Sequence, residues 1–332
     1  NNKYGLIMSK YKDIRGTHIT TVTADPPAPV NGQMWYNSTT QVVKGFTSNP
    51  AGTWSTGTAL NTARGYAGGV GIKTAALVFG GGPPPAPSAI DNTEQWNGSS
   101  WTELNDLNTA RAFVAGGGTY TSAIASGGDQ YTGVTESWNG TSWSNLTAAP
   151  NGKPSQGAAG ADNEELIIWG GTPPDTSNEY WNGSSWSEVA DLNHSVKTGG
   201  SAGTYAGALS FGGMTGPNTT TAQTESWNGS AWSEEADMNT ARRYQNNYSC
   251  GTSTSALCIG GDVPPTTGKT ESWNGSTWTE TGDLNTAGAG TSTGCADNGS
   301  GICSGGRGGP GIATNVEEFT APTTSTVTFT AS

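Results

Sequence analysis

Hydrophobic and polar positions along this chain alternate in short runs that are typical of β-strands. The runs are rich in Val, Ile, Thr, Tyr and Trp, and clusters of Gly, Asn, Ser and Pro separate them. No stretch shows a convincing helical periodicity. The pattern therefore predicts an all-β protein of many short strands and turns.

One phrase, Trp-Asn-Gly-Ser/Thr-x-Trp, recurs along the chain and defines its organisation. It spans Trp96 to Trp101, Trp138 to Trp143, Trp181 to Trp186, Trp227 to Trp232 and Trp273 to Trp278. The first Trp recurs after 42, 43, 46 and 46 residues, and a further step of 46 reaches Phe319. Such spacing indicates a repeat architecture. Because Asn-Gly favours a tight hairpin turn, each phrase predicts a hairpin with both Trp side chains on one face.

A glutamate stands two residues before the first aromatic residue of every repeat, and it shares that face because side chains alternate along a strand. These residues are Glu94, Glu136, Glu179, Glu225, Glu271 and Glu317. Catalysis by carboxylates needs two of them at one bond, whereas these stand one per repeat. We therefore expect each to be a structural hydrogen-bond acceptor, from an indole N–H, a backbone amide or a side chain of the next repeat.

The remainder of each repeat predicts two further strands. A connector resembling Leu-Asn-Thr-Ala-Arg comes first: Leu60 to Arg64, Leu107 to Arg111, the divergent Ala149 to Gly152, Leu192 to His194, Met238 to Arg242 and Leu284 to Ala287. A small-residue strand follows, then a strand that ends in a glycine pair: Gly80-Gly81, Gly127-Gly128, Gly170-Gly171, Gly212-Gly213, Gly260-Gly261 and Gly305-Gly306. Four strands in each of six units of about 45 residues predict a β-propeller.

An apolar strand that ends in Gly-Gly, followed by a variable loop and an aromatic pair, resembles the kelch repeat. The resemblance covers residues 58–332 and departs from the usual kelch phrase by having Glu-x-Trp where Tyr-Asp is more common. It implies a kelch-like propeller of six four-stranded blades, or of seven if the N-terminal hairpin closes a blade.

A second resemblance concerns about 50 residues near the N-terminus. The segment Gly32-Gln33-Met34-Trp35-Tyr36-Asn37, followed by the Leu-Asn-Thr-Ala-Arg connectors, is similar to structural proteins of marine tailed bacteriophages. In those phages such hairpins belong to virion-surface proteins. The resemblance implies a virion component.

The sequence divides into three parts. We expect residues 1–31 to form an extended basic arm, residues 32–57 a β-hairpin docking module or partial blade, and residues 58–332 the propeller. Phe46 and Trp54 look like a loosened version of the later Trp pair. Residues Thr324 to Thr330 alternate and are predicted to supply the outer strand of the sixth unit.

Composition and charge narrow the classes of function. Only 32% of the residues are hydrophobic and 51 are glycine, but 13 Trp, 10 Tyr and 6 Phe supply large apolar surfaces. The net charge of −12 argues against nucleic acid and anionic membranes as partners. No apolar run is long enough to insert into a membrane, and no signal-peptide pattern is visible.

The arginines Arg64, Arg111 and Arg242 stand in three connectors only. They either hold an anion near a propeller axis or, as we prefer, form ion pairs between blades. Cysteines occur as Cys250 with Cys258 and Cys295 with Cys303. Each pair is either a disulfide within a hairpin or reduced, and we favour reduced thiols because no signal peptide indicates an oxidising compartment.

The sequence gives little support for an enzymatic function. With only two histidines, the chain lacks ligands for a copper oxidase or a zinc site, and its turns lack the Asp of a sialidase Asp-box. We expect no catalytic residues, no metal and no cofactor.

The loops that follow the Gly-Gly pairs vary in sequence and are predicted to share one face with the connectors, so they are the candidate binding surface. Its candidate residues are Asp91, Asp129, Tyr131, Asp175, Met214, Asp262 and Arg307. Residues 1–44 carry a charge of +3, five Lys and Arg against two Asp, while the remainder carries −15, so the leader is either a docking segment or a solvated arm. The docking candidates are Lys10, Lys12, Arg15, Trp35 and Tyr36.

Together these observations favour a non-enzymatic structural protein of a bacteriophage virion, in the tail or a surface fibre. Other virion proteins would bind residues 1–57, and a host-surface glycan or protein would bind the loops. The protein would work as a homo-oligomer or within a larger assembly, located on the particle. The alternative is a secreted carbohydrate-binding lectin or sugar-active kelch-propeller enzyme.

Overall fold

The computed structural model describes residues 19–30, 32–49, 51–82, 88–129, 133–217, 219–244, 250–308 and 311–329. These residues form strands, turns and irregular segments without a helix, which confirms the all-β prediction. They make seven four-stranded sheets and one two-stranded ribbon.

The chain divides into two compact units. Unit 1 comprises Asn1–Gly52 and Pro322–Ser332, and unit 2 comprises Thr53–Ala321. The division differs from the boundaries expected from sequence at both ends of the propeller segment. Residues 53–57 belong to unit 2, and the segment from Pro322 onward belongs to unit 1.

Unit 1 contains a single four-stranded sheet. Its order is β1 (Thr20–Val22), β2 (Met34–Asn37), β3 (Val42–Asn49) and β30 (Thr323–Phe329). The predicted hairpin exists as β2 and β3, joined through Ser38 to Gln41. The prediction that Thr324 to Thr330 form the outer strand of the sixth repeat is wrong, because β30 pairs with β3.

Unit 2 contains six antiparallel sheets, five of which each come from one continuous repeat. They are β5 (Gly68–Ile72), β6 (Ala75–Phe79), β7 (Thr93–Trp96) and β8 (Trp101–Glu103); β9 (Ala115–Thr119), β10 (Ser122–Ser126), β11 (Thr135–Trp138) and β12 (Trp143–Asn145); β13 (Gly157–Asp162), β14 (Glu165–Trp169), β15 (Asn178–Trp181) and β16 (Trp186–Glu188); β17 (Gly200–Thr204), β18 (Gly207–Phe211), β19 (Thr224–Trp227) and β20 (Trp232–Glu234); β21 (Gly251–Thr252), β22 (Ser255–Ile259), β23 (Thr270–Trp273) and β24 (Trp278–Glu280).

The sixth sheet of unit 2 joins two distant parts of the chain. It contains β25 (Ser292–Asp297), β26 (Ser300–Ser304), β29 (Val316–Thr320) and, as its outer strand, β4 (Thr53–Thr56). Trp54 pairs with Phe319 in this sheet, so the expected partnership of Trp54 with Phe46 is wrong. The small ribbon β27 (Arg307–Gly308) and β28 (Gly311–Ile312) lies in the loop before β29.

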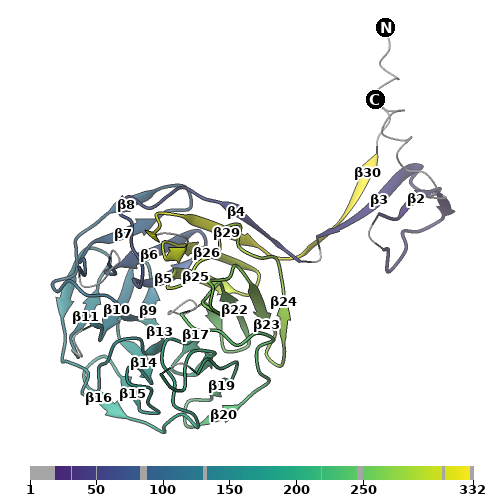
Figure 1. The fold of residues 1–332 in the computed structure, drawn as a ribbon. Helices are drawn as coiled ribbons and strands as arrows, with labels where there is room; N and C mark the ends of the chain where they lie inside the picture. The colour runs from purple at the N-terminus through teal and green to yellow at the C-terminus, as the bar shows by residue number, and fades with distance from the viewer. Residues whose placement is uncertain are drawn as a thin grey trace. The chain divides into compact units, whose positions relative to one another are not determined.

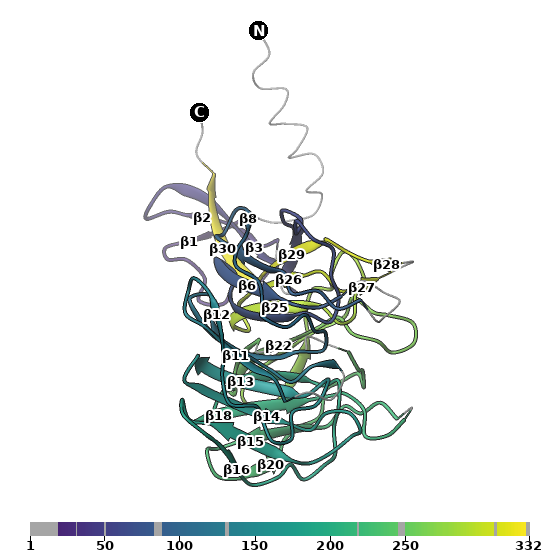
Figure 2. The same cartoon turned by 90° about the vertical axis from the view of Figure 1, so that its left-hand side faces the viewer.

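The first strands of the six sheets pack side by side: β5 on β9, β9 on β13, β13 on β17, β17 on β21, β21 on β25, and β25 on β5. Figure 1 shows unit 2 as a disc in which each sheet runs from the centre to the rim. In Figure 2 the β27–β28 ribbon and a neighbouring green loop project from the same side of this unit. The arrangement is consistent with a propeller-like fold.

The predicted tryptophan hairpins exist, and they close with four residues between the paired rings. Trp96 lies opposite Trp101, and their ring centroids are 5.3 Å apart. The side-chain oxygen of Asn97 accepts hydrogen bonds from the amides of Ser99 and Ser100. The Asn therefore holds the turn together while Gly98 adopts the positive φ that the turn requires.

The small residues of the innermost strands make room for large side chains of the second strands. A Cβ on Gly68 would lie 2.1 Å from the ring of Phe79, and one on Gly200 would lie 2.1 Å from that of Phe211. The Phe79 ring in turn meets Trp143 of the next sheet, with centroids 4.9 Å apart. Glycine in one strand thus permits the aromatic contacts that join neighbouring sheets.

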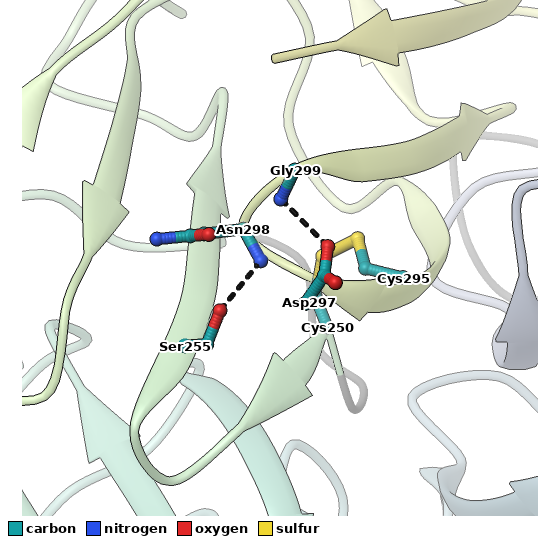
Figure 3. Close-up of a disulfide and its surroundings, with 6 residues drawn as sticks. All are labelled: Cys250, Ser255, Cys295, Asp297, Asn298 and Gly299. Carbon is teal, nitrogen blue, oxygen red and sulfur yellow. Dashed lines mark hydrogen bonds between the residues drawn. A yellow bond between two sulfur atoms is a disulfide. The ribbon is translucent and has the colours of Figure 1, made fainter. Parts of the chain in front are cut away.

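A disulfide joins two neighbouring sheets of unit 2. Cys250, immediately before β21, is bonded to Cys295 of β25, and their Cα atoms are 4.6 Å apart (Figure 3). Cys258 and Cys303 are buried and take no part in this disulfide. Both sequence-based alternatives are therefore wrong for Cys250 and Cys295, which are oxidised and joined across sheets. The register explains this, because Leu257 and not Cys258 donates its amide to Cys250.

The turn after Cys295 strengthens the same contact. The backbone amide of Asn298 donates a hydrogen bond to Ser255 Oγ at 3.0 Å, and its side-chain amide donates to the Trp273 carbonyl at 2.9 Å. Figure 3 shows the backbone amide of Asn298 directed at Ser255 Oγ beside the disulfide. The β25–β26 hairpin is therefore attached to the preceding sheet by a covalent bond and by polar contacts.

Candidate functional site at the centre of unit 2

The glutamate that recurs in each repeat holds the connector that leads into its own sheet. Glu94 accepts hydrogen bonds from the amide and side chain of Asn61 at 2.8 and 2.9 Å, and from the amide of Thr62 at 3.0 Å. Asn151, Asn193, Asn239 and Asn285 make the equivalent contacts with Glu179, Glu225, Glu271 and Glu317. The predicted role as hydrogen-bond acceptor is confirmed, with connector groups as the donors.

The connector arginines complete this arrangement. Arg64 Nη2 lies 2.6 Å from Glu94 Oε1, and both side chains are fully buried. Arg242 pairs with Glu271 in the same way, and Arg111 Nη2 lies 3.2 Å from Glu136 Oε1. Burial lowers the pKa of Arg64 and of Arg111, and the neighbouring carboxylate opposes that shift. The ion pairs form within one sheet and its connector, whereas the sequence suggested pairing between blades.

Two residues after the arginine position, every connector enters the left-handed region of the backbone. The φ angles are +57° at Tyr66, +57° at Phe113, +65° at Ser155, +56° at Thr198, +51° at Tyr244 and +63° at Gly290. Five of these six residues are not glycine. Such conformations cost on the order of 1–3 kcal/mol each, so other contacts must stabilise them.

These contacts are a closed circle of six backbone hydrogen bonds. Tyr66 N donates to Gly290 O, Phe113 N to Tyr66 O, Ser155 N to Phe113 O, Thr198 N to Ser155 O, Tyr244 N to Thr198 O and Gly290 N to Tyr244 O, over 2.7 to 3.2 Å. The segment that leads into each sheet of unit 2 contributes one residue, with one donor and one acceptor. We call these six residues the central ring.

The aromatic side chains of the central ring lie together on one part of it. The Tyr66 and Phe113 rings are stacked with centroids 4.3 Å apart, and Tyr66 meets Tyr244 edge-on at 6.0 Å. The Tyr66 ring lies over Gly290, where a Cβ would come within 2.7 Å of it. Glycine at this position therefore brings Tyr66 and Tyr244 into contact.

A second set of residues surrounds the central ring. It consists of the residue after each Gly-Gly pair: Gly82, Asp129, Thr172, Met214, Asp262 and Arg307. Each one bonds through its backbone to the residue that precedes a central-ring residue, for example Asp262 to Arg243 and Arg307 to Ala289. Connectors and post-Gly-Gly loops therefore lie side by side.

Arg243 links the aromatic and charged parts of this surface. Its Nε lies 3.1 Å from Asp262 Oδ2, its Nη1 lies 3.7 Å from Met214 Sδ, and its guanidinium carbon lies 5.5 Å from the Tyr244 ring centroid. Burial raises the pKa of Tyr66, and the positive charge of Arg307 opposes this shift. The result is a cluster of three aromatic rings with fixed charges at its edge.

Four of the seven predicted binding residues lie in this second set: Asp129, Met214, Asp262 and Arg307. Met214 is almost fully buried, whereas Arg307 is exposed. Asp91 and Asp175 lie further along their loops, where Asp175 pairs with Lys153. Tyr131 lies outside the described residues.

Of the predicted docking residues, Trp35 and Tyr36 belong to β2 of unit 1. Trp35 is buried and donates to Asp25 Oδ1 at 3.0 Å, so it stabilises the unit from inside, while Tyr36 is half-buried. Lys10, Lys12 and Arg15 lie outside the described residues.

Sequence reasoning missed Tyr66, Phe113, Arg243 and Tyr244. The signal for the three aromatic residues is a fixed offset, because each stands two positions after a connector arginine. Arg243 stands between Arg242 and Tyr244. The residue types vary among Tyr, Phe, Ser, Thr and Gly, so composition alone does not reveal the position.

No protein-family profile matches the chain, and no curated protein matches it. Among the described residues, no group of three or more His, Cys, Asp and Glu is placed to hold a metal ion. The described part of the chain also contains no helix long and apolar enough to cross a membrane.

Proposed function

We propose that unit 2 is a six-bladed kelch-like β-propeller and that the β2–β3 hairpin lies outside its ring of blades. The central ring supports this count, since it takes one residue from the segment that leads into each of six sheets. The sixth blade is completed by β4, a strand from the N-terminal side of the unit. Joining the two ends of the unit in one sheet is a common means of closing a propeller.

On this scaffold we propose a non-enzymatic structural protein of a tailed-bacteriophage virion, part of the tail or a surface fibre. In this proposal residues 1–57 bind another virion protein, and the surface around the central ring binds a glycan on the host. The observation that carries the binding role is the aromatic and ionic cluster formed by Tyr66, Phe113, Tyr244, Arg243 and Asp262.

Sugars suit such a surface. A pyranose ring presents an apolar face to an aromatic ring and hydroxyl groups to charged side chains. Phe113 and Tyr66 supply stacked rings, while Arg243 and Asp262 supply a donor and an acceptor held in place by their own ion pair. A rigid surface of this kind loses little conformational entropy on binding.

The buried glutamates support a binding role over catalysis. In every repeat the carboxylate is occupied by connector donors, as Glu94 is by Asn61 and Arg64. The alternative function, a cellular lectin or a sugar-active enzyme, shares the glycan-binding surface but needs no particle.

Glycan binding is tested with the full chain on a glycan array, followed by calorimetry with the best sugar. We expect Phe113→Leu and Arg243→Gln each to weaken binding by about tenfold or more, equivalent to about 1.4 kcal/mol. Tyr180→Leu is the matched control, because Tyr180 stacks on Tyr205 away from the central ring. Absence of binding to any glycan, or equal losses in all three variants, would overturn the proposed surface.

The virion role is tested by cryo-electron microscopy of particles from the source material. We expect residues 1–57 to make ordered contacts with another particle protein, and the same map reveals any homo-oligomer. A protein that is found free in solution as a monomer, with those residues unbound, would contradict the virion role and favour the lectin.

A further inference from the structure

Three repeats lack the buried connector arginine, and they differ in what replaces it. Lys153, Val196 and Gly288 stand where Arg64 stands in the first repeat, because each lies two residues before its central-ring residue and accepts a backbone hydrogen bond from the second glycine of a Gly-Gly pair. Lys153 is itself a cation and pairs with Asp175, and near Val196 the Nδ1 atom of His194 lies 3.3 Å from Glu225 Oε1. The connector that ends in Gly288 consists of Leu, Asn, Thr, Ala and Gly and supplies no cation.

A cavity occupies the corresponding place in this last repeat. It has a volume of about 30 Å³ and is lined by Gly288, Cys303, Gly305, Asn315 and Glu317, among others. A buried water needs on the order of 10–15 Å³ on this measure, so the space accommodates a group larger than one water.

The lining reproduces the surroundings of a guanidinium group. In the first repeat, Arg64 donates to Gly80 O at 3.3 Å, to Asn92 O at 2.7 Å and to Glu94 Oε1 at 2.6 Å. The equivalent residues in the last repeat, by position after the second strand and in β29, are Gly305, Asn315 and Glu317. All three line the cavity.

The carboxylate of Glu317 is held in the same pose as that of Glu94. Asn285 donates its amide and its side chain to Oε2 at 2.8 and 2.9 Å, and Thr286 donates its amide to Oε1 at 2.9 Å. Glu317 is only 5% exposed. A buried carboxylate without a positive partner is costly, so a cation that enters the cavity gains the attraction that Arg64 supplies elsewhere.

Glycine at position 288 is not required by the backbone. Its φ lies outside the left-handed region, and an added Cβ would come no closer than 3.3 Å to Thr291 Cγ2. The absence of a side chain at Gly288 therefore leaves the cavity open.

We propose that this cavity is a binding site for a guanidinium group, belonging either to a small guanidino compound or to an arginine side chain of a partner protein. The planar group presents several N–H donors in a fixed plane, which matches two carbonyls and one carboxylate better than a compact ammonium does. The site is independent of the glycan surface and of the virion role.

The test uses the full chain and guanidinium chloride at millimolar concentrations, far below denaturing levels, with sodium chloride at equal ionic strength as the reference. We expect a saturable rise in Tm for the wild type. Gly288→Arg fills the site with its own side chain, so its Tm should be higher at the start and should not rise with guanidinium. Glu317→Gln should weaken guanidinium binding by about tenfold or more.

Methylguanidine and N-acetyl-arginine amide distinguish the two sources. Equal binding of both indicates that the site accepts an arginine side chain, whereas binding of the smaller compound alone indicates a free ligand. No saturable effect in the wild type, or the same effect in Gly288→Arg, overturns the proposal. Because Gly288→Arg adds an interaction, its result stays informative even if Glu317→Gln does not fold.

Discussion

Trp54 lies directly opposite Phe319 in the sixth sheet of unit 2, with ring centroids 5.2 Å apart. The indole N–H of Trp54 donates to the Gly282 carbonyl at 2.9 Å, so the same side chain also reaches the segment between β24 and the last connector. The first strand of the unit is thereby fixed to its last sheet. In the other repeats, both rings of this pair come from one hairpin.

Replacement of Trp54 should therefore destabilise unit 2 as a whole. We expect Trp54→Ala to lower the free energy of unfolding by about 3–5 kcal/mol, the usual cost of removing a large buried aromatic side chain. Trp54→Phe is the control, since it keeps a ring beside Phe319, and it should cost less. Denaturant unfolding followed by tryptophan fluorescence measures both. Equal stability of Trp54→Ala and wild type would show that β4 contributes little.

The repeat itself was predictable, because the Trp pairs, the Gly-Gly pairs and the connector each recur at a fixed spacing. The strand that completes the last sheet was not, because β4 and β30 both alternate, and local sequence does not say which pairs with β29. The central ring also escaped prediction, since backbone hydrogen bonds at Ser155 or Thr198 require no particular side chain. Long-range strand pairing determines which strand completes the last sheet, and backbone geometry determines the central ring.

The Arg64–Glu94 pair is expected to act as a unit. Arg64→Met leaves a fully buried carboxylate without its cation and should cost about 3–5 kcal/mol. Adding Glu94→Gln removes the unpaired charge, so the double variant should recover part of that loss. Thermal and denaturant unfolding of the two single variants and the double variant give the coupling. Losses that simply add would contradict a direct interaction between the two side chains.

Gly290 should tolerate substitution worse than Gly288. A Cβ at Gly290 meets the Tyr66 ring at 2.7 Å, whereas a Cβ at Gly288 meets Thr291 at 3.3 Å. The positive φ of Gly290 is not the main obstacle, because Tyr66 and Tyr244 adopt similar values. We expect Gly290→Ala to lose about 1–3 kcal/mol through crowding, and Gly288→Ala to lose less. The unfolding midpoints of the two variants measure this difference. A larger loss for Gly288→Ala than for Gly290→Ala would contradict the contact of position 290 with Tyr66.

The four cysteines should behave as one disulfide, Cys250 with Cys295, and two buried thiols, Cys258 and Cys303. Burial raises the pKa of Cys303 to about 12, so its thiol stays protonated and unreactive at neutral pH. We expect no labelling by a thiol reagent in the native protein and labelling of Cys258 and Cys303 alone after denaturation without reductant. Peptide mapping should recover Cys250 joined to Cys295. Four labelled thiols in the unreduced protein would show that the disulfide is absent.

Unit 1 should lose stability in acid through Asp25. Its carboxylate accepts hydrogen bonds from Lys44, Asn37 and Trp35, which lower its pKa from 3.8 to about 2. A carboxyl group whose pKa is depressed on folding stabilises the folded state above its unfolded pKa, and that contribution disappears as the pH falls from about 4 toward 2. Asp25→Asn should remove this part of the pH dependence and weaken the sheet at neutral pH. Amide exchange of β2 and β3 between pH 2 and 5 measures the effect, with Asp91→Asn as a control in unit 2. Identical acid profiles for Asp25→Asn and the wild type would show that these contacts do not hold the sheet together.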